Sequence, residues 1–94
     1  MRIYDIIWLP AIEDKLLQKH NVQVEEVEDV LFDALHIRFV EKGHKIGEDL
    51  YAAYGQTMPG RWLIIFFVLK NQSEAMIISA RDMDRKERRY YARS

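Results

Sequence analysis

The 94-residue sequence has no cysteine, only two prolines and only four glycines. Without cysteine, the chain has no disulfides, no thiolate catalysis and no Cys-based zinc site, and it suits a reducing cytosol. The longest uninterrupted apolar run, Trp62–Leu69, is far shorter than the roughly 20 residues of a membrane-spanning helix. No basic segment followed by a long apolar stretch opens the chain, so we predict no signal peptide and a cytoplasmic location.

Several familiar motifs of enzyme active sites are also missing. The sequence contains no P-loop, no dinucleotide-binding fingerprint and no nucleophile-elbow serine. His20, His36 and His44 are spread along the chain, and no pair of them has the spacing of metal ligands. We therefore expect neither a metal nor another cofactor, and we interpret His36 and His44 as surface residues.

The composition is that of a folded protein, with 49% hydrophobic and 31% charged residues, and the length predicts one domain over residues 1–94. The net charge of −1 hides an asymmetry: residues 81–94 hold six of the fourteen basic residues and three of the fifteen acidic ones. This basic end suggests an anion-binding site, although a solvated helix face would have the same composition.

Hydrophobic periodicity predicts eight elements in the order β-α-α-β-β-β-β-α. Short hairpin connections between the last four strands predict an α+β fold, in which two N-terminal helices and a C-terminal helix pack on a twisted antiparallel sheet. The expected strands are Arg2–Leu9, Leu35–Glu41, Asp49–Thr57, Trp62–Leu69 and Glu74–Arg81; the expected helices are Ala11–His20, Val24–Asp33 and about Met83 to Ala92.

Local signals support several of these boundaries. Pro10 favours a helix start, and Asn21 can adopt the left-handed conformation that ends a helix. Asp84 and Glu87 form the pattern of a capping box, whereas Gln23 is a poor capping residue for the second helix. The segment Met58–Arg61 fits a type II turn with proline second and glycine third.

The strand Trp62–Leu69 is apolar on both faces, which is typical of a central strand covered on both sides. The two N-terminal helices can cover one face. For the other face two interpretations stay open: a partner chain or a second copy covers it, or the last helix does so with the rings of Tyr90 and Tyr91.

The candidate functional side chains are concentrated where the fifth predicted strand is followed by the last predicted helix. Arg81 ends that strand, and arginine, lysine, tyrosine and histidine suit RNA cleavage without a metal. In such a reaction the 2′-hydroxyl attacks the neighbouring phosphate, so the site needs a base, cations and an acid. Histidine or tyrosine could move the protons, and aromatic rings could stack on bases.

Each candidate residue also has a purely structural interpretation. Arg81 could be an ion-pair partner that anchors the last helix, and Arg61 could be an ordinary turn residue. His20 could simply end a helix, and Tyr90 could belong to the core.

Taken together, several short segments resemble the BrnT family of bacterial toxins, which has a RelE-like fold. The resemblance covers nearly the whole chain and depends on the order and spacing of the motifs. The segments are Ile7-Trp8-Leu9-Pro10, Lys19-His20-Asn21-Val22, Glu25-Glu26, Val30-Phe32-Asp33, Gly47-Glu48-Asp49, Tyr54-Gly55-Gln56-Thr57, Gly60-Arg61 and Ile77-Ile78-Ser79-Ala80-Arg81, followed by Arg85, Glu87, Arg88, Arg89 and Tyr90.

The resemblance implies the toxin of a type II toxin–antitoxin pair, an endoribonuclease that cuts RNA without a metal and inhibits translation. The implied partners are RNA and a ribbon-helix-helix antitoxin, whose complex with the toxin binds operator DNA; a homodimer is an open alternative. The implied catalytic residues are Arg81, Arg85, His20 and Tyr90, and the implied RNA-binding residues are Arg61, Lys19, Arg88 and Arg89.

A second interpretation comes from a different class of protein. The basic helix and the apolar face could serve only complex formation, as in a decayed toxin. Arg81 would then be structural, and a buried ion pair of Arg81 with Glu87 or Asp84 would favour this interpretation.

Overall fold

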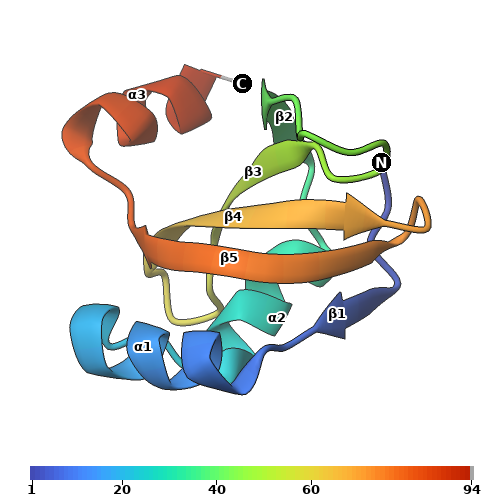
Figure 1. The fold of residues 1–94 in the computed structure, drawn as a ribbon. Coiled ribbons are helices and arrows are strands. Elements are labelled where there is room, and N and C mark those ends of the chain that lie inside the picture. The colour runs from blue at the N-terminus through green and yellow to red at the C-terminus, as the bar shows by residue number, and fades with distance from the viewer. Residues whose placement is uncertain (94) are drawn as a thin grey trace.

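The structure, a computed structural model, describes residues 1–93, and its elements follow the predicted order (Figure 1). No helix within these residues is long and apolar enough to cross a membrane. The elements are β1 (Asp5–Ile7), α1 (Pro10–His20), α2 (Val24–Phe32), β2 (His36–Glu41), β3 (Leu50–Gln56), β4 (Trp62–Lys70), β5 (Glu74–Asp82) and α3 (Arg85–Arg93).

All five strands form one sheet in the order β1-β5-β4-β3-β2. The neighbours among β2 to β5 are antiparallel, as their short connections predicted. β1 pairs parallel with β5, Asp5 opposite Glu74, so the sheet is mixed rather than wholly antiparallel. β1 and β2 lie at opposite edges of the sheet. The two helices between them form a connection long enough to carry the chain from one edge to the other, so β1 is not restricted to a hairpin with the next strand.

The helices α1 and α2 lie together on one face of the sheet, and α3 lies on the other (Figure 1). Leu63, Ile65 and Phe67 of β4 point toward the first layer and are fully buried. They pack there with Leu16 of α1 and Val27 of α2. The prediction that the two N-terminal helices cover one face of β4 is confirmed.

The second face is only partly covered. Ile64 is fully buried in a smaller cluster with Met83 and Tyr91, so the segment around α3 covers one end of the face. α3 itself contains no buried residue, and Phe66 and Met76 farther along the face stay half-buried. The interpretation that the last helix covers this face therefore holds for one end, where Tyr91 packs. Cover of the rest by a partner chain or a second copy stays a prediction.

The local signals gave mostly correct boundaries. α1 begins at Pro10, and Asn21 ends it in the left-handed conformation with a φ of 52°. The turn before β4 closes one residue earlier than predicted, because Gly60 N–H donates to the carbonyl of Thr57 at 2.9 Å. At the start of α2, the Glu26 side chain accepts a hydrogen bond from the backbone N–H of Gln23 at 3.0 Å. This bond stabilises the helix start although Gln23 is a poor capping residue.

Candidate functional site

Two neighbouring residues at the end of β5 point to opposite faces of the sheet. Arg81 lies opposite Ile64 and shares its α3-facing side, whereas Asp82 lies opposite Leu63 on the side of α1 and α2. Each belongs to a group of polar side chains. We call the group around Arg81 the sheet-face cluster (Arg38, Tyr54, Arg81, Glu87, Tyr90). We call the group around Asp82 the strand-end cluster (His20, Glu26, Arg61, Asp82, Arg88).

An ion pair forms the centre of the sheet-face cluster. The guanidinium of Arg81 donates to both carboxylate oxygens of Glu87, at 2.7 and 2.9 Å. Glu87 also accepts the backbone N–H of Asp84, and Asp84 accepts that of Glu87, which confirms the predicted capping box of α3. Arg81 therefore joins β5 to α3, as its structural interpretation predicted.

The charges of this pair stabilise each other. The hydrogen bond from Arg81 lowers the pKa of Glu87, while burial acts in the opposite direction. The hydrogen bond to Glu87 likewise raises the pKa of Arg81. The Arg81 side chain nevertheless stays 36% exposed above the ring of Phe66. An anion from solution can therefore reach it if it displaces the Glu87 carboxylate.

Two further residues of the sheet-face cluster, Arg38 and Tyr54, were not predicted as site residues from the sequence. Arg38 Nε donates to the hydroxyl of Tyr54 at 3.0 Å, and the Tyr54 ring lies 5.0 Å from the ring of Tyr90. Their signal was strand alternation: Arg38 faces away from its apolar neighbours Ile37 and Phe39. Only the pairing of β2 with β3 brings Arg38 near the end of β5.

Arg61 occupies the centre of the strand-end cluster. Its guanidinium donates to the backbone carbonyls of His20 and Asn21 at 2.8 and 2.7 Å. It also donates to both carboxylate oxygens of Asp82 and of Glu26, at 2.7 to 3.2 Å. Arg61 thus ties the end of α1, the start of α2 and the end of β5 together. A cation suits the C-terminus of α1, where unpaired carbonyls and the helix dipole are negative.

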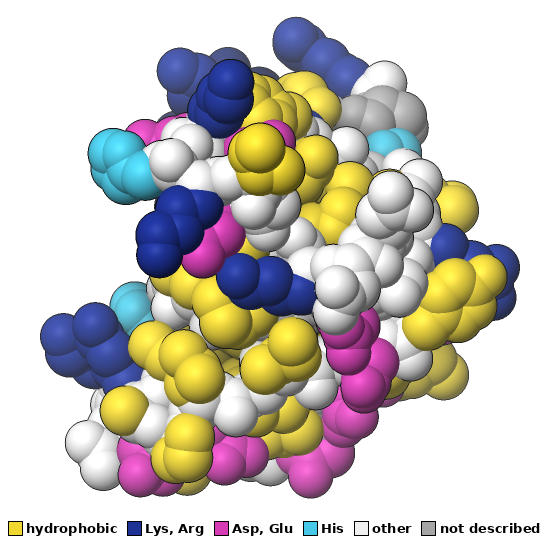
Figure 2. Space-filling model, turned by 45° about the vertical axis from the view of Figure 1, so that its right-hand side comes forward, with side chains coloured by type: hydrophobic (Ala, Val, Ile, Leu, Met, Phe, Trp, Pro, Cys, Tyr) yellow, Lys and Arg dark blue, Asp and Glu magenta, His cyan; other side chains and the backbone are white. Residues whose placement is uncertain are grey.

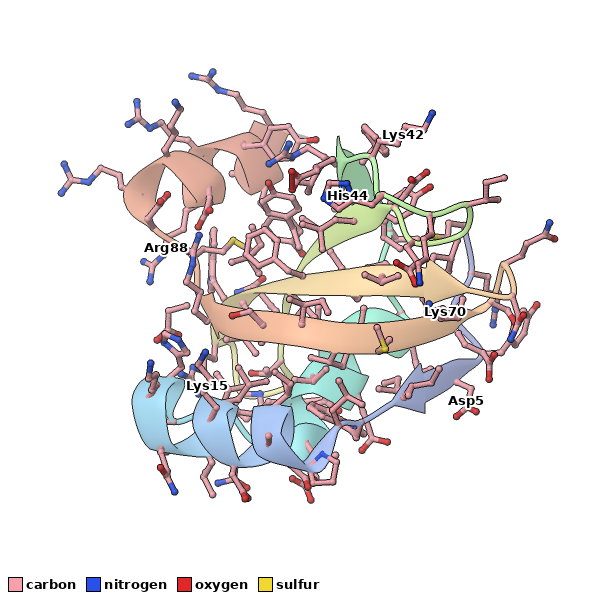
Figure 3. The ribbon with its side chains drawn as sticks, viewed as in Figure 1. Asp5, Lys15, Lys42, His44, Lys70 and Arg88 are labelled. Atoms are coloured by element: carbon pink, nitrogen blue, oxygen red, sulfur yellow. The ribbon has the colours of Figure 1, made fainter. Side chains whose placement is uncertain are left out.

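The electrostatics of the strand-end cluster centre on Asp82. The hydrogen bond from Arg61 lowers the pKa of Asp82, and the nearby charges of Arg88 and His20 act in the same direction. The guanidinium of Arg88 also lies 5.5 Å from the centre of the Trp62 ring. Figure 3 shows Arg88 beside the end of β5, at the gap between α3 and α1.

The remaining predicted residues lie on the surface. Arg85 and Arg89 are exposed on α3, and Lys19 is exposed on the last turn of α1. Within residues 1–93, the side chains of these three residues make no hydrogen bond and no ion pair. In Figure 2 most acidic side chains gather over the lower part of the visible face, whereas basic side chains are spread over its top, its middle and its sides. α3 carries five basic residues and one acidic residue.

The structure therefore divides the predicted site residues between two places. Arg81 and Tyr90 belong to the sheet-face cluster. His20 and Arg61 belong to the strand-end cluster on the α1 and α2 side of β5, and Arg88 approaches the same strand end from α3. Among the described residues, no three His, Asp or Glu side chains gather as metal ligands would.

Comparison with known proteins gives one family and one fold. A model of the family described as "Ribonuclease toxin, BrnT, of type II toxin-antitoxin system" matches residues 8–87. A crystal structure of the ribonuclease toxin BrnT from Brucella abortus is similar to this chain, with a TM-score of 0.60 and 17% sequence identity. The similarity covers 86% of this chain and 97% of that one. A comparison with curated protein sequences found none that matches.

Proposed function

This chain belongs to the BrnT family of ribonuclease toxins of type II toxin–antitoxin systems, and from that premise we propose that it is a metal-independent endoribonuclease that inhibits translation. The observation that carries the proposal is the family match over residues 8–87, which includes the junction of β5 with α3. The sheet-face cluster supports it, because it offers an accessible arginine beside two tyrosines.

The proposed reaction needs only groups that this chain has. The 2′-oxygen of a ribose bonds to the adjacent phosphorus and gives up its proton to a base. The bond from phosphorus to the 5′-oxygen breaks, and an acid gives that oxygen a proton. The products are a 2′,3′-cyclic phosphate and a free 5′-hydroxyl. Negative charge grows on the phosphate oxygens in between, and cations stabilise it.

We assign the phosphate to Arg81, with Arg85 as a second cation from the first turn of α3. The planar fork of a guanidinium can bind two phosphate oxygens at once. In the free protein the Glu87 carboxylate holds this fork. Substrate binding therefore exchanges one bidentate anion for another. Tyr90 belongs to the same cluster and is 46% exposed, and it is our first candidate for proton transfer.

The other predicted residues would line the path of the RNA around the end of β5. Lys19, Arg88 and Arg89 supply cations to this path, and His20 is the second candidate for proton transfer. An RNA contact of Arg61 stays a prediction, and it would require one of the ion pairs of Arg61 to open.

Cleavage of a labelled structured RNA in excess EDTA tests the proposal. We expect the purified chain to cut, and we expect Arg81→Ala to lose the cutting while it keeps the far-UV circular dichroism of the folded protein. Lys15→Ala is the matched control, because it removes an exposed cation from α1, on the opposite face of the sheet. Equal cutting by all three proteins would show that the site does not use Arg81.

A toxin of a type II system has a cognate antitoxin. We propose that this antitoxin is a ribbon-helix-helix protein, that it covers the accessible part of the α3-facing sheet surface, and that operator DNA binds only to the complex. A homodimer through the same surface is the other occupant to test. We place the toxin in the cytoplasm, where its RNA substrates are.

One observation favours a second candidate function, a non-catalytic interaction module. Both Arg81 and Arg61 are engaged in ion pairs, as a purely structural role would require. A translating extract separates the two functions. A toxin stops protein synthesis there and Arg81→Ala does not, whereas a module leaves synthesis unchanged in both forms.

A further inference from the structure

Strand pairing lines up residues of three strands across the α3-facing side of the sheet. Tyr54 of β3 lies opposite Ile64 of β4, and Ile64 lies opposite Arg81 of β5. Adjacent strands are roughly 4.8 Å apart, so the backbones of Tyr54 and Arg81 are about 10 Å apart. Arg38, on the outer strand β2, continues this line through its hydrogen bond to the Tyr54 hydroxyl. The sheet therefore presents two guanidinium groups, one on each side of Tyr54.

The two arginines differ in how they are paired. Arg81 is held by the carboxylate of Glu87. Arg38 is exposed and forms no direct ion pair within residues 1–93. Its charge acts on Glu87 only at longer range, where it helps to lower the pKa of that carboxyl. Its guanidinium carbon lies 5.9 Å from the centre of the Tyr54 ring. With Nε bound to the hydroxyl, the two terminal nitrogens of Arg38 are left to bind an anion.

Tyr54 is suited to hold Arg38 in place. Its side chain is buried, with 3% of the residue exposed, so its hydroxyl has a fixed position. A guanidinium bound to a fixed acceptor loses fewer conformations when a phosphate binds, because part of its freedom is already lost. Tyr90 completes the surface: its ring lies beside that of Tyr54 and is accessible to solvent.

We propose that Arg38, positioned by Tyr54, is a second phosphate-binding residue, and that single-stranded RNA crosses the sheet surface beside α3 with phosphates on Arg81 and Arg38. The inference rests on the proposed ribonuclease function and names its substrate class. A single strand fits because its splayed bases can stack on an exposed ring such as that of Tyr90, and its backbone can follow two cations on one surface.

Binding of an uncleavable probe tests the inference apart from catalysis. The probe is a fluorescein-labelled, single-stranded 2′-O-methyl RNA, in which the attacking hydroxyl is blocked. Its fluorescence anisotropy is measured with the whole chain and with Arg38→Gln, Tyr54→Phe, the double variant and Lys15→Gln. The last variant removes the same charge from the opposite layer and serves as the matched control. Circular dichroism checks the fold of each variant.

We expect Arg38→Gln to weaken binding about tenfold, which corresponds to roughly 1.4 kcal/mol and fits the loss of one charged hydrogen-bonding group. The slope of log affinity against log salt should fall by about 0.7, the value of one phosphate contact on a single strand. Tyr54→Phe should weaken binding by a smaller factor. It should add nothing on the Arg38→Gln background, since a positioning residue acts through the residue that it positions.

Two results would overturn the inference. One is that Arg38→Gln binds the probe with the affinity and salt slope of Lys15→Gln. The other is that a chain that cuts RNA does not bind the single strand at all. Failure of the proposed function is distinct, because it appears as equal RNA cutting, or none, by the wild-type chain and Arg81→Ala.

Discussion

The carboxylate of Glu87 accepts two hydrogen bonds from the Arg81 guanidinium, at 2.7 and 2.9 Å, and also caps the first turn of α3. Glu87 therefore holds the start of α3 in place and also forms an ion pair with Arg81, the cation that would bind phosphate. The structural and the catalytic interpretations of Arg81 do not exclude each other, since the same fork can bind Glu87 in the free protein and phosphate in the complex.

Replacing Glu87 by Gln should therefore change stability and RNA binding in opposite directions. The amide keeps the shape but loses the charge, so the free energy of unfolding should fall by about 1 to 2 kcal/mol. RNA should bind more tightly, because phosphate no longer competes with an anion for Arg81. Urea unfolding and anisotropy measure the two effects. Weaker binding by a folded variant would show that Glu87 does not compete with the substrate.

Replacing Arg61 should be among the most destabilising single changes. Arg61→Ala leaves two carboxylates and two helix-end carbonyls without their cation in a partly buried place, so we expect a loss of about 2 to 4 kcal/mol. Arg61→Lys should recover only part of this loss, because an ammonium cannot reach all four groups.

Lys70→Ala is the control for Arg61, since it breaks the single surface pair of Lys70 with Glu48 at 3.4 Å. Such exposed pairs contribute at most about 1 kcal/mol. Urea unfolding of all three variants gives the comparison. An Arg61→Ala loss no larger than that of Lys70→Ala would contradict the structural role of Arg61.

The stability of the protein should fall in acid through Glu87 and Asp82. Their ion pairs lower both pKa values in the folded state, so the unfolded chain binds protons more readily as the pH drops. The stabilisation is complete above the ordinary carboxyl pKa values near 4 and is lost as the pH falls through the lowered folded values. Glu87 should dominate, since its side chain is 17% exposed and that of Asp82 is 57% exposed.

Urea unfolding between pH 7 and pH 3 measures this dependence. Glu87→Gln should show a shallower loss of stability than the wild-type chain over the acid half of that range. Identical pH profiles for the two proteins would mean that the pair with Arg81 contributes no pH-dependent stability.

Replacing Gly55 by Ala should destabilise the packing of α2 on the sheet. A β-carbon at position 55 would lie 2.9 Å from Cγ1 of Val30, and Val30 is itself buried. Overpacking of this kind costs about 1 to 3 kcal/mol. In the double variant with Val30→Ala the two losses should not add, because the second change makes room for the first. Additive losses in thermal unfolding would show that the contact is not the cause.

Local and periodic features of the sequence determined the elements and much of their packing. The apolarity of Trp62–Leu69 on both faces indicated a central strand, and its neighbours pair with it as expected. Pro10, Asn21 and the Asp84–Glu87 box marked helix ends correctly, because each acts through dihedral preferences or hydrogen bonds within a few residues. The basic character of α3 was likewise visible in the sequence alone.

Contacts between distant segments were decided by the tertiary structure. The parallel pairing of β1 with β5 depends on where two helices cross the sheet, which no local pattern encodes. Arg61 became the centre of an ion-pair cluster, and Arg38 came to lie beside Tyr54, only because strand pairing and helix packing brought the partners together. Residue types and short-range geometry can be read from the order of the chain, whereas the partners of a charged side chain depend on segments that meet only when the chain folds.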